Sequence, residues 1–199
     1  MKLYFAPSTC SLAPAIILHE LGLPHEMIRV DNATKRTADG RDFLAINPKG
    51  YVAALELDNG AVLTEGPVIV QYLADLRPDA GLAPPTGSWE RLRLQEWLNF
   101  ISSELHAGVT PLFNKTLPAA VRAHFRARVE VRMTVVESAL QRQQHLTGAT
   151  FSVADVFLYT VLQWFAWFDI PLAAWPAVEA WYKRVAVRPA VQVAHLQHG

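Results

Sequence analysis

The one cysteine of this chain, Cys10, occupies a position that favours thiol chemistry. It ends the stretch MKLYFAPSTC, in which an apolar strand-like segment leads through a Pro-containing turn to the predicted start of a helix. Unpaired N–H groups and the helix dipole stabilise an anion there, so we expect the thiol pKa to fall below its usual value of about 8.5. The alternative is a small buried apolar residue, which is the usual role of a free cysteine.

A second candidate lies where a predicted strand meets a predicted helix, in the sequence Thr64-Glu65-Gly66-Pro67. Free N–H groups at the helix start suit a carboxylate, and the Glu65 carboxylate suits an ammonium. Gly66 allows a ligand to approach the backbone closely. These features predict a site for a zwitterion. The alternative is that Glu65 merely caps the helix.

A third candidate is a polar stripe on a predicted helix. Asn99, Ser103 and His106 are separated by four and three residues, a spacing that places them on one side of an α-helix. Three hydrogen-bonding side chains facing one direction suit a ligand. A solvated surface explains the same spacing, and His106 alone does not establish a site.

The sequence following Cys10 resembles a CxxC redox motif in which Ala13 replaces the second cysteine. Dithiol exchange within one chain is therefore excluded. Two single-thiol reactions remain: Cys10 forms a mixed disulfide with a small thiol, or it stabilises the anion of that thiol. No Cys and His residues have zinc-ligand spacing, so we expect no metal.

Composition indicates which kinds of partner and which cellular compartment to expect. The 199 residues are 51% hydrophobic, and 18 Lys and Arg balance 18 Asp and Glu, so no net field attracts nucleic acid or an anionic membrane. A single cysteine excludes an internal disulfide, and the start lacks the features of a signal peptide. The most apolar run, residues 153–168, is shorter than the ~20 residues that span a bilayer. We expect a cytoplasmic protein without membrane or nucleic-acid partners.

Strand and helix patterns alternate in the first part of the chain. Asn59-Gly60 between two apolar runs is a strong hairpin signal. The predicted strands are 2–5, 26–30, 53–57 and 61–64, and the predicted helices are 11–21, 41–45 and 66–76. The order is βαβ followed by ββα, which predicts a four-stranded mixed sheet with helices packed against it.

A segment rich in Pro and Gly separates this part from one with only helical patterns. We predict domains at residues 1–78 and 88–199, with 79–87 as the linker. Predicted helices cover 89–107 and 119–144, and two more begin at the capping box of Ser152 with Asp155 and at Trp175-Pro176. Trp164, Phe165, Trp167 and Phe168 are expected to pack in the core rather than line a cleft. The C-terminal end, with His195 and His198, is expected to be frayed.

Several stretches together carry a family resemblance: MKLY…CSL, FLAINPKG, LTEGPVIVQYLAD, EWLNF…SELH and FSVADVFLYTVLQW. Across nearly its whole length the sequence resembles the bacterial beta-class glutathione transferases. The resemblance implies an α+β, thioredoxin-like first domain, an all-α second domain and a two-fold homodimer. It also implies glutathione as co-substrate between the two domains, and detoxification as one role of such enzymes.

The resemblance assigns functions to particular residues. Cys10 matches the family's thiol, and His106 matches the histidine that approaches it from the second domain. Asn99 and Ser103 match glutathione contacts on the same helix. We therefore expect Cys10 and His106 to act on the glutathione sulfur.

Four residues of the first domain match the family's remaining glutathione contacts. Glu65 and Gly66 match the clasp for the γ-glutamyl end, and Lys35 matches a contact to the glycyl end. Val52 matches the residue whose backbone pairs with the cysteinyl part.

The sequence departs from the family pattern at Ala53, where the family has a cis-proline. A cis bond costs about 0.5–1 kcal/mol before proline and about 2.5–4 kcal/mol before another residue. The sequence therefore does not decide whether the bond between Val52 and Ala53 is cis or trans. A trans bond would redirect Val52 and weaken the activity. Tyr51 and Ala107 also replace residues with more polar contacts in the family.

The favoured hypothesis is a glutathione transferase that conjugates glutathione to a small hydrophobic electrophile or exchanges mixed disulfides. The alternatives are a non-catalytic binding protein with the same fold and a glutaredoxin-like reductase.

Overall fold

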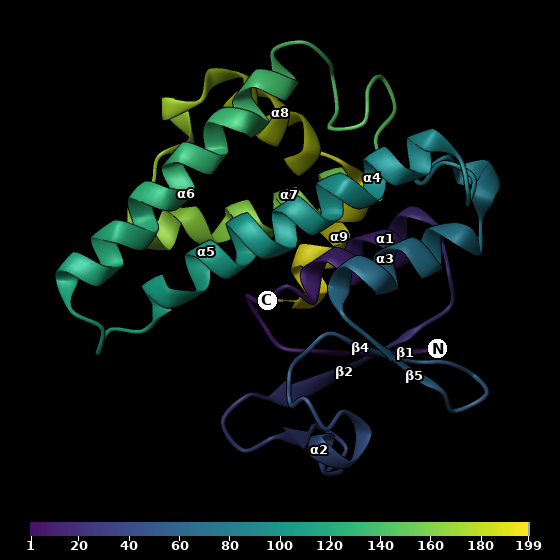
Figure 1. Ribbon diagram of the computed structural model, residues 1–199. Helices are drawn as coiled ribbons and strands as arrows, with labels where there is room; N and C mark the ends of the chain where they lie inside the picture. Colours follow the sequence, from purple (N-terminus) through teal and green to yellow (C-terminus); the bar gives the residue numbers. More distant parts are fainter. Residues whose placement is uncertain (199) are drawn as a thin grey trace. The chain divides into compact units, whose positions relative to one another are not determined.

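The computed structural model describes residues 1–198 (Figure 1). Its contacts divide the chain into a first unit, Met1–Ala80 with Val187–Gly199, and a second unit, Gly81–Ala186. The division after Ala80 falls within the segment 79–87 that was predicted as the linker. The segment that begins at Val187 groups with the first unit, whereas the predicted second domain, 88–199, included it, and its helix was not predicted because the last predicted helix ended before Pro189.

The first unit is built on a mixed sheet with the strand order β3-β2-β1-β4-β5. Its strands are β1 (Lys2–Phe5), β2 (Glu26–Asp31), β3 (Arg36–Thr37), β4 (Ala54–Glu56) and β5 (Val62–Thr64). Strands β1 and β2 are parallel because a helical crossover, α1 (Leu12–Glu20), joins them, and the other neighbours are antiparallel. The prediction of four strands was short by one, because the two residues of β3 lie in a polar loop that shows no alternation.

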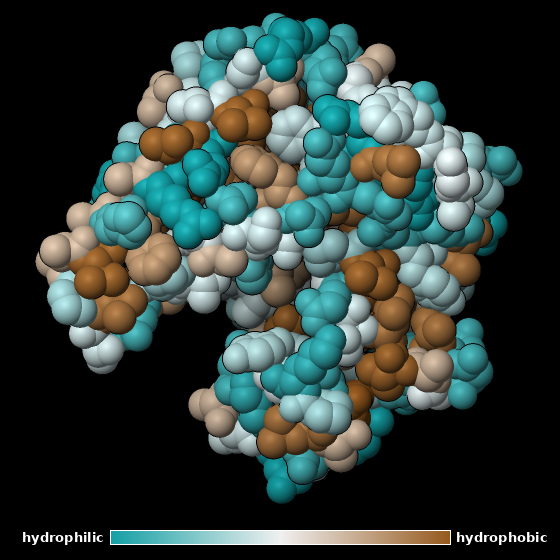
Figure 2. Space-filling view, viewed as in Figure 1, coloured by the Kyte–Doolittle hydropathy of each residue, from teal (hydrophilic) through white to brown (hydrophobic). Residues whose placement is uncertain are grey.

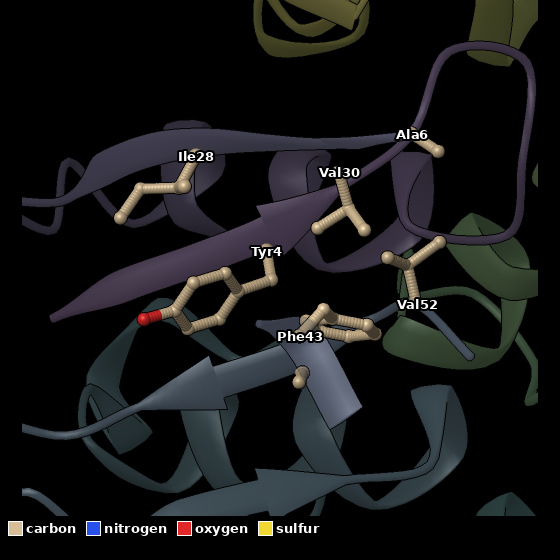
Figure 3. Packing of buried hydrophobic residues seen from close by; sticks show 7 residues of the cluster. Tyr4, Ala6, Ile28, Val30, Phe43 and Val52 are labelled. Atoms are coloured by element: carbon tan, nitrogen blue, oxygen red, sulfur yellow. The ribbon is translucent and has the colours of Figure 1, made fainter. Parts of the chain in front are cut away.

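Helices α1 and α3 (Gly66–Asp75) contact each other and lie on one side of this sheet in Figure 1, and the short helix α2 (Phe43–Ile46) lies on the other. Figure 3 shows the buried cluster beside α2. Its members are Tyr4, Ala6, Ile28, Val30, Phe43, Val52 and Ala54. Because the Val52 side chain is fixed in this cluster, the core anchors the loop that leads into β4.

The C-terminal helix α9 (Pro189–His198) packs against α1 within the first unit. Two bonds from Arg188 to Glu20 secure its start, with Nε to Oε1 at 2.7 Å and a terminal nitrogen to Oε2 at 2.9 Å. Such a paired contact is stronger than a single neutral hydrogen bond. His198 is buried with 3% of its surface exposed. The prediction of a frayed C-terminal end is therefore wrong.

The second unit is helical throughout its regular elements. These are α4 (Trp89–Phe100), the π-helical η2 (Ile101–His106), α5 (Ala107–Val109), the 3₁₀ segment η3 (Thr110–Phe113), α6 (Ala119–Leu140), α7 (Val153–Leu162), the 3₁₀ segments η4 (Gln163–Phe168) and η5 (Leu172–Ala174), and α8 (Pro176–Ala186). Another 3₁₀ segment, η1 (Pro78–Ala80), ends the first stretch of the first unit. The predicted capping box of Ser152 and Asp155 is present at α7, every residue of which is buried.

Charged side chains on the surface of the helical unit form ion pairs with one another. Glu104 pairs with Arg132 at 2.6 Å and with Arg128 at 3.2 Å. On the face drawn in Figure 2, the surface of this unit is mostly hydrophilic, with scattered hydrophobic residues. Leu92 and Val131 are among the exposed hydrophobic residues of the unit. Within residues 1–198, no helix is both long and apolar enough to cross a membrane.

Candidate active site

Cys10 lies one residue before the N-cap of α1, Ser11, and is half-buried. Its Sγ donates a hydrogen bond to the backbone oxygen of Val52 at 3.4 Å. Two residues that are distant in sequence and that the resemblance placed in one site therefore meet within the first unit. A thiol can donate this hydrogen bond only while it is protonated.

Burial raises the pKa of Cys10 to about 11. The N–H groups of Cys10 and Ala53 act in the opposite direction, and the negative charge of Glu65 adds to the rise. Loss of water disfavours the charged form of a thiol, and here this effect exceeds that of the local donors. The prediction of an acidic thiol made anionic by the helix terminus is therefore wrong.

The segment that carries Cys10 contacts the C-terminal helix through Ser11. Ser11 Oγ lies 2.8 Å from His198 Nε2 and 2.7 Å from Thr9 Oγ1, and Thr9 Oγ1 donates to the backbone oxygen of Ala6 at 2.8 Å. Burial lowers the pKa of His198 to about 4, with a smaller contribution from the charge of His195. A neutral imidazole thus supports the residue next to Cys10. Sequence reasoning missed it because 187 residues separate the partners.

Side chains from the first unit also hold the loop that carries Val52. Lys35 Nζ donates to the backbone oxygen of Gly50 at 2.9 Å and lies 5.9 Å from the centre of the Tyr51 ring. The buried Asn47 donates through Nδ2 to the backbone oxygen of Tyr51 at 2.7 Å. Lys35 therefore contacts the residues that directly precede Val52 in this loop. Asn47 was not predicted, although it belongs to the quoted stretch FLAINPKG.

The peptide bond between Val52 and Ala53 is cis. The sequence left this isomer open, because alanine replaces the proline of the family pattern.

Glu65 is the N-cap residue of α3 and has a positive φ of 72°. Within the described residues its side chain makes no capping hydrogen bond, so the alternative that Glu65 only caps the helix is wrong. Its Oε1 instead accepts a bond from Lys49 Nζ at 2.6 Å. Non-glycine residues in this backbone region cluster at ligand sites. Gly66 follows as the first residue of α3.

In the second unit, Asn99 lies near the end of α4, and Ser103 and His106 lie in the π-helical segment. Ser103 Oγ donates to the backbone oxygen of Asn99 at 2.9 Å, so these two exposed residues meet. His106 is half-buried, and its ring packs edge to face with that of Trp164, with 5.1 Å between the ring centroids. The prediction assumed α-helical spacing, whereas a π turn, often found at functional sites, carries two of the three residues.

An aromatic group surrounds Phe113, which the sequence analysis did not single out. Its ring lies 4.7 Å from that of Phe168 and 5.7 Å from those of Trp164 and Trp167, all edge to face. Trp164 and Phe165 are buried, as expected for core residues. Trp167 is 53% exposed, so core packing was the wrong expectation for this ring.

Within residues 1–198, no group of three His, Cys, Asp or Glu side chains is arranged to hold a metal ion.

Comparison with known protein families assigns the two parts of the chain. Residues 7–76 match the family "Glutathione S-transferase, N-terminal domain", and residues 100–189 match "Glutathione S-transferase, C-terminal domain". The chain belongs to the glutathione S-transferase family. The predicted thioredoxin-like domain followed by a helical domain is confirmed.

Individual relatives extend this assignment. The chain is 43% identical over 194 residues to glutathione S-transferase GstA of Escherichia coli O157:H7, covering 98% of this chain and 96% of the relative. A sphingomonad glutathione S-transferase solved in complex with glutathione is 43% identical, with a TM-score of 0.97 and coverage of 100% and 99%. A bacterial beta-class enzyme from Sphingomonas chungbukensis is 41% identical, with a TM-score of 0.96 and the same coverage.

These matches confirm the resemblance to the bacterial beta class. They also confirm the hypothesis of a glutathione transferase that acts on the sulfur of glutathione as its co-substrate.

Proposed function

We propose that this glutathione transferase uses Cys10 as a neutral hydrogen-bond donor to the glutathione thiolate. The observation that carries the proposal is the contact of Cys10 Sγ with the backbone oxygen of Val52, in a setting that keeps the thiol protonated. When glutathione binds, the S–H group turns from this oxygen to the sulfur anion of the ligand. The same peptide segment then pairs with the cysteinyl part of glutathione.

The reaction is a nucleophilic substitution or addition. The glutathione sulfur donates an electron pair to the electrophilic carbon, an S–C bond forms, and a leaving group departs with its electron pair where the electrophile has one. A covalent role for Cys10 requires its thiolate. With a pKa near 11, the thiolate fraction at pH 7 is on the order of 10⁻⁴. Of the two single-thiol reactions, stabilisation of the glutathione anion is therefore favoured over mixed-disulfide exchange.

The glutathione contacts in the proposal follow the family pattern. Glu65 and Gly66 bind the γ-glutamyl end, Lys35 the glycyl end, and the Val52 backbone the cysteinyl part. The positive φ of Glu65 and the placement of Lys35 beside the loop of Val52 support these assignments. Asn99 and Ser103 of the second unit are further proposed contacts, and His106 is proposed to act with Cys10 on the sulfur.

The electrophile in this proposal is a small hydrophobic molecule. The partly exposed aromatic rings of Phe113, Trp167 and Phe168 support an aromatic substrate, because such rings pack edge to face on one another. A two-fold homodimer, a cytoplasmic location suited to the single free cysteine, and a role in detoxification complete the proposal. Light scattering of the purified chain tests the dimer.

The experiment that tests the role of Cys10 compares two substitutions in turnover of an aryl halide at saturating glutathione. Cys10→Ala removes the donor and is expected to lower kcat by roughly 100-fold. Cys10→Ser keeps a donor at the same place and is expected to retain much of that activity. Two results contradict the proposal: an unchanged kcat in Cys10→Ala, or a Cys10→Ser enzyme as inactive as Cys10→Ala, which would indicate a nucleophilic thiolate.

A further inference from the structure

The ion pair of Lys49 and Glu65 leaves one hydrogen-bond donor and one acceptor available at the start of α3. Lys49 Nζ donates to Glu65 Oε1 at 2.6 Å and to Thr64 Oγ1 at 3.0 Å. An ammonium has three donor protons, so one remains. Within residues 1–198, the second carboxylate oxygen of Glu65, Oε2, has no hydrogen-bond donor. A ligand end with one cation and one anion matches this remaining pair.

The start of α3 has few N–H groups to offer an anion. Pro67 has none, and those of Val68 and Ile69 donate to the backbone oxygen of Glu65 at 3.0 and 2.9 Å. Gly66 is the remaining donor of the first turn. Helix termini that bind anions normally present several free N–H groups. The expectation that free N–H groups at this helix start hold a carboxylate is therefore only partly met. A ligand carboxylate bound there would need a cationic side chain in addition to the Gly66 N–H group.

Lys49 is placed to be that partner. Its side chain is 54% exposed and that of Glu65 is 61% exposed, so both charges are accessible to a ligand. Lys49 also lies in the loop that follows Asn47, whose amide fixes the backbone of Tyr51. The same loop thus carries the Val52 contact to Cys10 and the ammonium beside Glu65.

We propose that Lys49 binds the α-carboxylate of the γ-glutamyl residue of glutathione while Glu65 Oε2 binds its α-ammonium. The pair then recognises the amino-acid zwitterion and discriminates against thiols that lack either charge. This inference rests on the proposed function, because it assigns the γ-glutamyl end to the start of α3. It adds Lys49 to the binding residues and gives each charge of the ligand one partner.

Calorimetric titration with three ligands tests the assignment: glutathione, 4-aminobutyryl-Cys-Gly, which lacks the α-carboxylate, and glutaryl-Cys-Gly, which lacks the α-ammonium. Lys49→Met is expected to weaken glutathione binding roughly 5-fold, the effect of one exposed charge contact. The same substitution should not weaken binding of 4-aminobutyryl-Cys-Gly, which has no carboxylate for Lys49 to bind. Glu65→Gln should weaken binding of glutathione but not of glutaryl-Cys-Gly.

Two controls accompany these variants. Lys49→Arg keeps the charge and should bind glutathione nearly as well as the wild type. Lys183→Met removes the lysine of another exposed ion pair, with Glu179 at 2.9 Å, and should leave all three affinities unchanged.

Three outcomes overturn the inference. Equal weakening of glutathione and 4-aminobutyryl-Cys-Gly by Lys49→Met would show that Lys49 only positions Glu65. Unchanged glutathione binding in Lys49→Met would show that Lys49 does not contact the ligand, and tighter binding would show that Lys49 competes with the ligand for Glu65. If the wild type fails to bind glutathione at millimolar concentration, the proposed function fails as well. If the wild type binds glutathione, Glu65→Gln weakens that binding and Lys49→Met does not, the inference about Lys49 fails and the proposed function stands.

Discussion

The starts of α7 and α1 are both buried and polar, but their partners come from very different distances along the chain. At α7, Asp155 accepts hydrogen bonds from the backbone and hydroxyl of Ser152, at 3.0 and 2.8 Å, three residues away. At α1, Ser11 meets His198 from the opposite end of the chain. The first arrangement is a local motif, whereas the second exists only because α9 packs against α1.

The two junctions also differ in how many bonds depend on one side chain. Asp155 additionally accepts bonds from the Leu146 backbone and from Trp181 Nε1, both at 3.0 Å, and has no exposed surface. Among residues 1–198, the hydrogen-bonding partner of His198 is Ser11, and its ring packs 5.2 Å from that of Phe5. We therefore expect that removing the Asp155 side chain lowers the free energy of unfolding more than removing the His198 side chain does.

The largest expected effect is that of Asp155→Ala. The substitution leaves several buried donors without an acceptor, so we expect the free energy of unfolding to fall by about 3–5 kcal/mol. Urea unfolding followed by circular dichroism measures the change. Asp155→Asn, which keeps an acceptor oxygen, should lose less, and a loss below about 1 kcal/mol for Asp155→Ala would contradict the central role of this carboxylate.

His198→Ala is expected to lower the free energy of unfolding by about 2–4 kcal/mol, because it removes a buried ring and leaves Ser11 without this partner. The same unfolding measurement applies. Leu196→Ala is the matched control on α9, since Leu196 is 86% exposed and its loss should cost under about 0.5 kcal/mol. Equal effects of the two variants would mean that the contact between α9 and Ser11 does not support the first unit.

The acid sensitivity of the first unit follows from the lowered pKa of His198. The unfolded chain binds a proton at this residue below about pH 6.5, whereas the folded chain does so only below about pH 4. Stability is therefore fully present above pH 6.5 and falls as the pH drops toward 4, by roughly 2–3 kcal/mol. Unfolding free energies measured across this range should fall less in His198→Gln, and an identical pH profile would contradict the assignment.

The smallest expected effect concerns the reactivity of Cys10 beside the same junction. Its raised pKa lowers the thiolate fraction at pH 7, and the greater nucleophilicity of a basic thiolate recovers part of the loss. Alkylation by iodoacetamide should be on the order of 20-fold slower in the folded protein than in urea. The rate should keep rising up to about pH 11. Faster alkylation of the folded protein at pH 7 would instead indicate an acidic thiol.

Local patterns predicted much of this fold. The residues of β1, α3 and the capping box of α7 were located within a residue or so, because alternation, helical spacing and capping depend on neighbours in sequence. The family resemblance assigned residues to the candidate site, and two of them, Cys10 and Val52, contact each other in the structure. Two local features still went undetected: β3 is too short to show a period, and the π turn of η2 has the same apolar spacing as an α-helix.

The sequence by itself determined most of the order of the elements, the placement of a thiol before one helix and the placement of the Glu65 carboxylate at the start of another. Only the tertiary structure decided the state of the thiol, because the pKa of Cys10 depends on burial by segments distant from it in the chain. The same holds for His198, which becomes a buried partner of Ser11 through helix packing across 187 residues, and for Lys49, which meets Glu65 across a loop. Local propensity reports on neighbours in sequence, whereas desolvation and charge pairing depend on neighbours in space.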